Sequence, residues 1–302
     1  MKILVTGSTG LVGTALVKAL ANDGHTVCRL IRQQSKTTSG SKDGFDVAWN
    51  PATCELGAAG VGPDAVINLA GASIAGGRWT QKRKELLRTS RIDTTRALVK
   101  ALARMNAPPR VLVSASAIGI YGDRTDEVLT EESKPGTDFL AGLAQEWEAE
   151  ALKAEALGIR VVLARFGIIL ARHGGALAKM LLPFKLGAGG RLGSGKQWMS
   201  WITLEDVVGI IRFALENSAV RGAVNAVAPQ PAQNLAFTKT LAQALHRPAL
   251  FPAPAFALRL ALGEMADALL LSSQRVNSQK LQQLGYSFLY SDLLSALGAV
   301  LS

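Results

Sequence analysis

The 302-residue sequence predicts an α/β fold in which a doubly wound parallel sheet carries helices on both faces. Strand-like apolar runs alternate with amphipathic stretches up to about residue 170. The runs at 65–70 and 110–115 are almost uninterrupted, as expected of parallel strands that are buried on both faces. The first apolar run, Ile3 to Val5, leads into a glycine-rich turn and then into an amphipathic stretch. Together these features are typical of a parallel sheet covered by helices.

The same pattern gives the order of the elements. We expect strands near 2–6, 26–31, 46–49, 64–69, 110–115, 160–166 and 222–226, and helices near 11–23, 80–106, 137–157 and 204–217. The alternation ends after Gly167, and from Pro229 onward the chain is rich in Pro, Ala and Leu. We therefore predict a main domain of residues 1–170 plus about 204–228, and a smaller discontinuous C-terminal domain of about 171–203 and 229–302.

The glycine-rich turn after the first strand has the spacing Gly-x-x-Gly-x-x-Gly. Glycine permits a positive φ and leaves no side chain between the backbone and a diphosphate, which then lies on the N-terminus of the following helix. Because the turn joins a first strand to a helix, it predicts a dinucleotide site in a Rossmann-like domain, with a purely structural turn as the alternative. The residues predicted to bind the dinucleotide here are Gly7, Ser8, Thr9, Gly10, Leu11, Val12 and Gly13.

The residues around the end of the second strand predict which dinucleotide is bound. NAD sites usually place Asp or Glu there for the ribose 2′-hydroxyl, whereas a 2′-phosphate requires cations. The chain has no acidic residue between Asp23 and Asp43. Arg32 stands where the strand should end, and Lys36 follows it. We therefore expect NADP(H) as the cofactor, bound by Arg32 and Lys36, with ordinary surface cations as the alternative.

Other strands also end in small or polar residues. The carboxyl ends of parallel strands meet at one edge of the sheet, and ligands of open α/β sheets bind at that edge. We expect further cofactor contacts there from Leu69, Ala70, Gly71, Ser114, Ala115, Arg165, Phe166 and Gly167. An arginine that ends a core strand needs an anionic partner, which is either a carboxylate of the protein or a phosphate of a ligand.

Composition limits the class of protein. Hydrophobic residues make up 48% of the chain, but no run approaches the roughly 18 apolar residues of a membrane span. The net charge is +10, yet basic residues are not interleaved with aromatics, and the densest basic cluster, within 82–104, is expected to be a solvated helix face. We therefore expect neither nucleic acid nor a membrane as a partner. Cys28 and Cys54 lack metal-ligand spacing and no export signal is visible, which predicts reduced thiols, no metal site and a cytoplasmic location.

Several segments resemble the extended short-chain dehydrogenase/reductase superfamily. They are Thr6-Gly-x-x-Gly-x-x-Gly13, Asn68-Leu-Ala-Gly71, Ser114-Ala-Ser-Ala-Ile-Gly-Ile-Tyr-Gly122 and Leu204-Glu-Asp-Val-Val208. The segments that narrow the resemblance are Trp147-Glu-x-Glu-Ala151, the stretch from Gly189 to Ile202, and the blocks that begin at Pro252 and Ser273. With them, the whole chain is similar to the atypical branch known as epimerase family proteins, which are related to NAD-dependent epimerases and dehydratases and carry their own C-terminal domain. The resemblance implies a fold and a cofactor more firmly than a reaction.

The sequence departs from that superfamily at its acid/base pair. The pair is Tyr-x-x-x-Lys on a helix, and its lysine lowers the pKa of the tyrosine. None of the three tyrosines in this chain is followed by a lysine four residues later. Tyr121 and Ser116 are the candidate catalytic residues, and packing beside the nicotinamide is the alternative for Tyr121. Glu146 and Glu148 lie on the helix that should carry the pair, and we expect them to be solvated, with one of them facing the cleft as the alternative.

Substrate contacts are expected from the stretch before the fourth helix. Aromatic side chains stack on bases or sugars, and cations bind diphosphates. We expect Arg191, Trp198 and Trp201 to contact substrate, near Lys196 and Trp147, with at least one of the tryptophans in the core. The sequence thus predicts an NADP(H)-binding oxidoreductase or epimerase-like protein acting on a nucleotide-linked or otherwise phosphorylated small molecule. The alternative is a non-catalytic NADP(H)-binding redox sensor or partner-binding protein, and the oligomeric state is left open.

Overall fold

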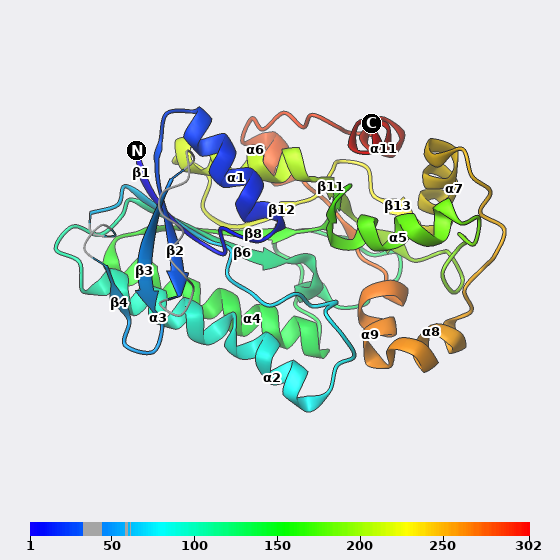
Figure 1. Cartoon of the computed structure of the whole chain (residues 1–302), viewed down its shortest axis with the longest axis horizontal. Coiled ribbons are helices and arrows are strands. Elements are labelled where there is room, and N and C mark those ends of the chain that lie inside the picture. Colours follow the sequence, from blue (N-terminus) through cyan, green and yellow to red (C-terminus); the bar gives the residue numbers. More distant parts are fainter. Residues whose placement is uncertain (33–43, 58–59, 61) are drawn as a thin grey trace.

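The computed structural model of the chain describes residues 1–32, 44–57, 60 and 62–302. Within these residues the largest sheet has eight strands in the order β12-β8-β6-β5-β1-β2-β3-β4 (Figure 1). The strands are β1 Lys2–Thr6, β2 Thr26–Arg32, β3 Phe45–Asn50, β4 Glu55–Leu56, β5 Ala65–Asn68, β6 Val111–Ala117, β8 Arg160–Phe166 and β12 Gly222–Ala226. All neighbours are parallel except β3 and β4. The predicted α/β fold is confirmed.

Helices cover both faces of this sheet (Figure 1). They are α1 (Leu11–Asn22) and α6 (Leu204–Glu216) on one face, and α2 (Gln81–Thr89), α3 (Ile92–Ala103) and α4 (Phe139–Leu152) on the other. Successive side chains of a strand point to opposite faces. Accordingly, Ile3 and Val5 belong to the core that includes α1 and α6, whereas Leu4 belongs to the core that includes α3 and α4.

The single helix predicted over 80–106 is two helices, α2 and α3, so that prediction was wrong. Two residues at the break bond to a distant loop instead of continuing the helix. Ser90 Oγ accepts the N–H of Ala72 at 3.0 Å, and Arg91 Nη2 donates to the carbonyl of Ala72 at 3.0 Å. Periodicity carries no trace of such tertiary bonds.

The helix predicted over 137–157 is α4 followed by a 3₁₀ helix, Lys153–Leu157. The side chain of Asp138 accepts the N–H of Ala141 at 2.9 Å and caps the start of α4. Gly158 ends the segment in the left-handed region, with φ of 76°.

A second core lies beside the main sheet, at the right of Figure 1. Its elements are β9 Ile168–Ala171, α5 Gly175–Lys185, β10 Trp198–Met199, β11 Trp201–Thr203, β13 Ala232–Gln233, α7 Asn234–Leu245 and α11 Leu293–Leu301. The helices α8 Ala255–Leu262 and α9 Glu264–Ala266 follow α7 along the chain. This core joins residues from both stretches assigned to the smaller domain, such as Leu181 and Leu241, although the domain bounds stay a prediction.

The C-terminal segment returns to the main sheet's edge. There β14 (Arg275–Val276) pairs in parallel with β7 (Val128–Leu129), and α10 (Gln279–Gln283) follows. In the described parts of the chain, every helix is too short or too polar to cross a membrane.

Candidate functional site

The turn between β1 and α1 can form only with glycine at two of its positions. Gly7 has φ of 67°, and a Cβ there would lie 2.5 Å from the carbonyl oxygen of Leu69. A Cβ on Gly13 would lie 2.2 Å from the carbonyl oxygen of Gly7. Both distances are below any real contact, so the two glycines allow the backbone to fold tightly on itself and on the 69–71 segment.

The end of α1 at this turn offers N–H groups without side-chain partners. The cap residue Gly10 makes no side-chain hydrogen bond, and the first turn of α1 holds no acidic residue. Thr9 and Gly10 are exposed, while Leu11 and Val12 are half-buried and Ser8 is buried. Since a helix N-terminus favours anions, the turn has the geometry and the polarity that a diphosphate requires.

This turn lies at the point where the strand order of the sheet reverses. β1 pairs with β2 on one side and with β5 on the other, and ligands of doubly wound sheets bind at such a point. The end of β5 is fixed to β1 by Thr6, whose Oγ1 donates to Asn68 Oδ1 at 2.7 Å and accepts the N–H of Leu69 at 3.1 Å. Leu69 and Ala70 are half-buried and Gly71 is exposed. The structure therefore brings the predicted residues of both loops together.

Beneath the two loops lies a buried polar network. Asn68 Nδ2 donates to Thr95 Oγ1 at 2.8 Å and to Ser114 Oγ at 3.2 Å, and Trp147 Nε1 donates to Thr95 Oγ1 at 2.9 Å. Ser114 is fully buried and Ala115 is 8% exposed. These two predicted cofactor residues thus lie under the site, and their contact with a cofactor stays a prediction.

Arg32 is the last residue of β2, opposite Trp49 of β3, which places it at the predicted edge. Lys36 lies outside the described residues. A second arginine of β2, Arg29, is already paired, with its Nη2 2.6 Å from Asp46 Oδ1. Arg29 is therefore engaged by the protein itself.

Tyr121, the candidate proton donor, is closed off from solvent. It is 0% exposed in the 3₁₀ helix Ile118–Tyr121, its hydroxyl donates to Asn225 Oδ1 at 2.6 Å, and the hydroxyl accepts from Arg165 Nη1 at 2.9 Å. Burial raises the pKa of Tyr121, and the nearby Arg165 offsets this only in part. A tyrosine in this environment is a poor acid at neutral pH, so its catalytic role stays a prediction that the geometry disfavours.

Arg165 has a carboxylate partner inside the protein, which decides between the two alternatives for it. Its Nε and Nη2 each donate to Glu148 at 2.8 Å, and its Nη1 also donates to the carbonyl of Glu131 at 3.1 Å. Burial alone would lower the pKa of Arg165, but the bonds to Glu148 outweigh it and raise that pKa. The bidentate pair is 8% and 7% exposed. Four of the five N–H donors of Arg165 are therefore used inside the protein, and its contact with a cofactor phosphate stays a prediction that this geometry disfavours.

The expectation that Glu148 is solvated is wrong, because its carboxylate also accepts from Ser116 Oγ at 2.6 Å. Ser116, the other candidate for catalysis, is 2% exposed. Glu146 is exposed as expected and pairs with Arg88. We refer to Ser116, Tyr121, Glu148 and Arg165 below as the buried network.

The remaining strand-end residues, Phe166 and Gly167, are packed against other parts of the chain. A Cβ on Gly167 would lie 2.5 Å from the carbonyl oxygen of Ser200, so glycine is required for this close approach. Phe166 is half-buried and packs against the core that includes α1 and α6.

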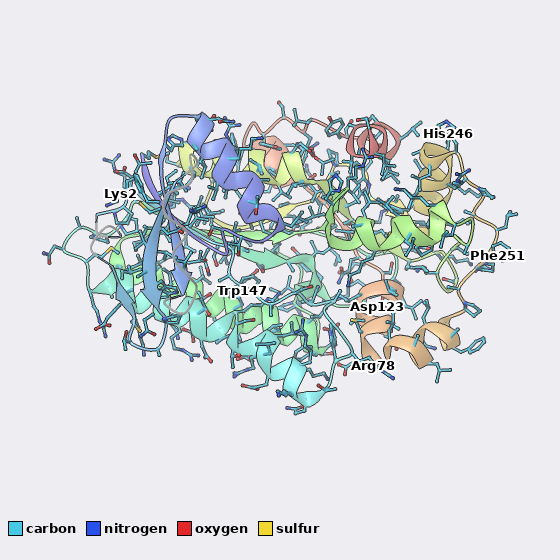
Figure 2. All side chains as sticks on the ribbon, in the orientation of Figure 1. Lys2, Arg78, Asp123, Trp147, His246 and Phe251 are labelled. Atoms are coloured by element: carbon cyan, nitrogen blue, oxygen red, sulfur yellow. The ribbon has the colours of Figure 1, made fainter. Side chains whose placement is uncertain are left out.

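The three substrate candidates differ in accessibility. Trp201 is 0% exposed in the second core and cannot contact a substrate there, so that prediction is corrected. Trp198 is half-buried; its Nε1 donates to Asp126 Oδ1 at 2.6 Å, and Arg275 lies 4.6 Å from its ring centroid. Arg191 is exposed and donates to the carbonyl of Gly193. Trp147, labelled in Figure 2, is a core residue at 6% exposure.

Comparison with known proteins identifies relatives of the whole chain. Residues 3–226 match the NAD dependent epimerase/dehydratase family, and residues 253–300 match a domain of unknown function, DUF1731. The epimerase family protein YfhF of Bacillus subtilis is 41% identical, covering 100% of this chain and 98% of its own. The chain belongs to the NAD dependent epimerase/dehydratase family.

Two solved structures align closely with this chain. The human epimerase family protein SDR39U1, solved with NADPH, has a TM-score of 0.89 and 34% identity over 99% of both chains. A nucleoside-diphosphate sugar epimerase from Corynebacterium glutamicum has a TM-score of 0.79 and 32% identity, covering 100% of this chain and 58% of its own.

Two groups of residues near the candidate site could not be found from the sequence. Asn225 and Glu131, which complete the buried network, lie on other elements and carry no local signal. Arg83 and Arg91 belong to the basic cluster that was expected to be a solvated face. Both instead bond to the loop that follows β5, and the only signal in the sequence is the density of cations there.

Proposed function

We propose that the chain binds NADP(H) in preference to NAD(H). The observation that carries the proposal is the position of Arg32 at the carboxyl end of β2, beside the glycine turn of β1. No acidic residue occurs in the sequence between Asp23 and Asp43. An acidic residue there would bind a ribose 2′-hydroxyl and repel a 2′-phosphate. The human relative that was solved with NADPH supports the same choice.

We propose further that the protein acts in the cytoplasm as an oxidoreductase or epimerase-like enzyme on a nucleotide-linked or otherwise phosphorylated small molecule. The support is the relative described as a nucleoside-diphosphate sugar epimerase, at 32% identity. The bound nicotinamide would supply hydride chemistry. The chain's own residues hold the dinucleotide at the glycine turn and place Trp198 and Arg191 on the side of the second core.

A second candidate function is NADP(H) binding without turnover, as a redox sensor or partner-binding protein. It is favoured by the absence of Tyr-x-x-x-Lys from the sequence and by the buried bonds of Tyr121 and Ser116. The hydroxyl groups of these two residues would have to leave Asn225 and Glu148 before they could exchange a proton with a substrate.

The test is calorimetric titration of the purified protein with NADPH and NADH, beside the variants Arg32→Ala and Lys18→Ala. Lys18 is an exposed cation on α1 and serves as the matched control. NADPH should bind at least about tenfold tighter than NADH, and Arg32→Ala alone should remove that difference. Equal affinities in the wild type, or a preference that survives Arg32→Ala, would contradict the proposal.

Turnover separates the two candidate functions. Loss of NADPH absorbance in the presence of UDP-sugars or sugar phosphates supports an enzyme. Tight NADPH binding with no consumption across such a panel supports the sensor or partner-binding role.

A further inference from the structure

The loop that follows β5, residues 71–79, is held almost entirely by side chains. Four consecutive carbonyls, those of Ala72 to Ala75, each accept a side-chain donor. The donors, in that order, are Arg91, Arg83, Trp79 and Lys179. Three of these four donors are therefore cations that bond to neutral carbonyl groups.

These three cations have no carboxylate partner among the described residues. The neighbours of Arg83 on α2 differ in this respect, because Lys84 pairs with Glu264 and Arg88 pairs with Glu146. The stretch 71–91 contains six basic residues and a single acidic one, so local charge is strongly positive. Burial, and to a smaller extent the nearby Arg83, lower the pKa of Arg91 to about 10.

The loop lies between the dinucleotide turn and the second core. It begins beside Gly7, whose Cβ would touch Leu69 and Ala70. Near its end is Arg78, which Figure 2 places beside α9, and whose Nη2 would be 3.4 Å from a Cβ on Gly263. Lys179 reaches the loop from α5, on the other side of the domain junction. A ligand bound next to the dinucleotide would meet this loop.

We propose that Arg83 and Lys179, with the 71–79 loop, form a subsite for a phosphate group of the second ligand. Arg83 donates to the carbonyl of Ser73, and Lys179 donates to the carbonyl of Ala75. Residues two positions apart in an extended chain are separated by at most about 7 Å, so the two cationic groups lie close together. Phosphate oxygens are charged acceptors, and hydrogen bonds to them are roughly twice as strong as bonds to neutral groups. Phosphate therefore displaces the carbonyls of Ser73 and Ala75 as the partner of these cations.

The remaining contacts of the loop explain why the exchange is possible. A Cβ on Gly76 would lie 2.4 Å from Arg83 Nη2, so glycine leaves room for the guanidinium in its present position. The Nε of Arg83 is buried and has no hydrogen-bond partner within the described part of the chain. Arg91 stays in place, because it also donates to the carbonyl of Leu87 in α2.

This inference rests on the proposed function, since it places a second, phosphorylated ligand beside the cofactor. The experiment is calorimetric titration with inorganic pyrophosphate of the protein already saturated with NADPH, so that the dinucleotide turn is filled. It compares the wild type with the double variant Arg83→Gln/Lys179→Gln and with Lys82→Gln, an exposed cation on the same helix.

Pyrophosphate should bind the NADPH-loaded wild type and Lys82→Gln alike, and the double variant at least about tenfold more weakly, with an unchanged Kd for NADPH. Equal binding by the double variant, or no binding by the wild type, would overturn the inference. A loss of NADPH affinity in the double variant, with pyrophosphate binding intact, would also overturn it, because the phosphate recognised would be the cofactor's own. If NADPH does not bind the wild type, the proposed function fails, and the same comparison on the free protein decides the subsite separately.

Discussion

Two regions at the same carboxyl edge of the sheet are built in opposite ways. The turn after β1 is made of backbone, requires glycine at positions 7 and 13, and leaves helix N–H groups without side-chain caps. The buried network after β6 and β8 is made of side chains that satisfy one another, and Tyr121 within it is 0% exposed. This edge of the sheet therefore has an open half suited to a ligand and a closed half in which the buried network holds α4 to the sheet.

Breaking the ion pair in the closed half should have the largest effect. Glu148→Gln leaves the Arg165 guanidinium buried without a carboxylate, which should lower the free energy of unfolding by about 3–5 kcal/mol. Denaturant unfolding measures this change. The control is Glu146→Gln, on the exposed side of the same helix, which should stay close to the wild type. A Glu148→Gln protein as stable as the wild type would show that the buried network does not stabilise this half of the edge.

Adding a side chain to the glycine turn of the open half should destabilise the protein less than Glu148→Gln does. It should also remove most of the affinity for the nucleotide. Gly7→Ala adds a Cβ 2.5 Å from the Leu69 carbonyl oxygen, which should lower the free energy of unfolding by about 2–4 kcal/mol and remove NADPH binding. Gly24→Ala is the matched control, because Gly24 has a similar φ of 79° with nothing within 4 Å of its Cβ. It should cost only about 1–2 kcal/mol and leave NADPH binding intact. Unchanged NADPH affinity in Gly7→Ala would contradict the assignment of the turn.

Removing one hydroxyl from the closed half should have a smaller effect. Tyr121→Phe deprives Asn225 and Arg165 of a hydrogen-bond partner, which should lower the free energy of unfolding by about 1–3 kcal/mol. Tyr290→Phe is the control, since the hydroxyl of Tyr290 has no hydrogen-bond partner in the described structure. NADPH affinity should be unchanged in both variants. A selective loss of turnover in Tyr121→Phe, without loss of stability, would instead make Tyr121 an accessible acid.

The smallest expected effect is on stability at neutral pH, where the buried phenols stay protonated. At alkaline pH their ionisation should destabilise the folded protein. Burial raises the pKa of Tyr121 in the closed half, and burial together with Asp206 raises the pKa of Tyr286, which lies outside it beside α6. Because the folded state favours the protonated phenols, their contribution is complete below about pH 10 and is lost as the pH rises through the folded-state pKa values. Phenolate absorbance from these two residues should therefore appear together with the loss of circular dichroism. Absorbance that appears while the fold persists would show that the phenols are accessible.

The same contrast explains what could be predicted from the sequence. The strand, turn and helix from Lys2 to Asn22 are encoded locally, by an apolar run and by glycines at fixed spacing, and could be predicted. The partners of Glu148 and Tyr121 come from β8 and β12, and Asn225 lies 104 residues from Tyr121, so no local pattern contains them. For the same reason Glu148 resembles a solvated helix residue in the sequence. The break at Arg91 is set by the loop after β5, which periodicity cannot reveal.

Hydrogen–deuterium exchange with and without NADPH tests the contrast between the two halves most directly. At an NADPH concentration of 100 Kd, binding stabilises the contacted region by about 2.7 kcal/mol, which slows exchange there about 100-fold. For amides that exchange through local fluctuations, the account predicts this protection at residues 7–14 and 69–72, with no change across the segments of Ser116, Tyr121 and Glu148. Protection confined to the latter segments, or absent from residues 7–14, would contradict it.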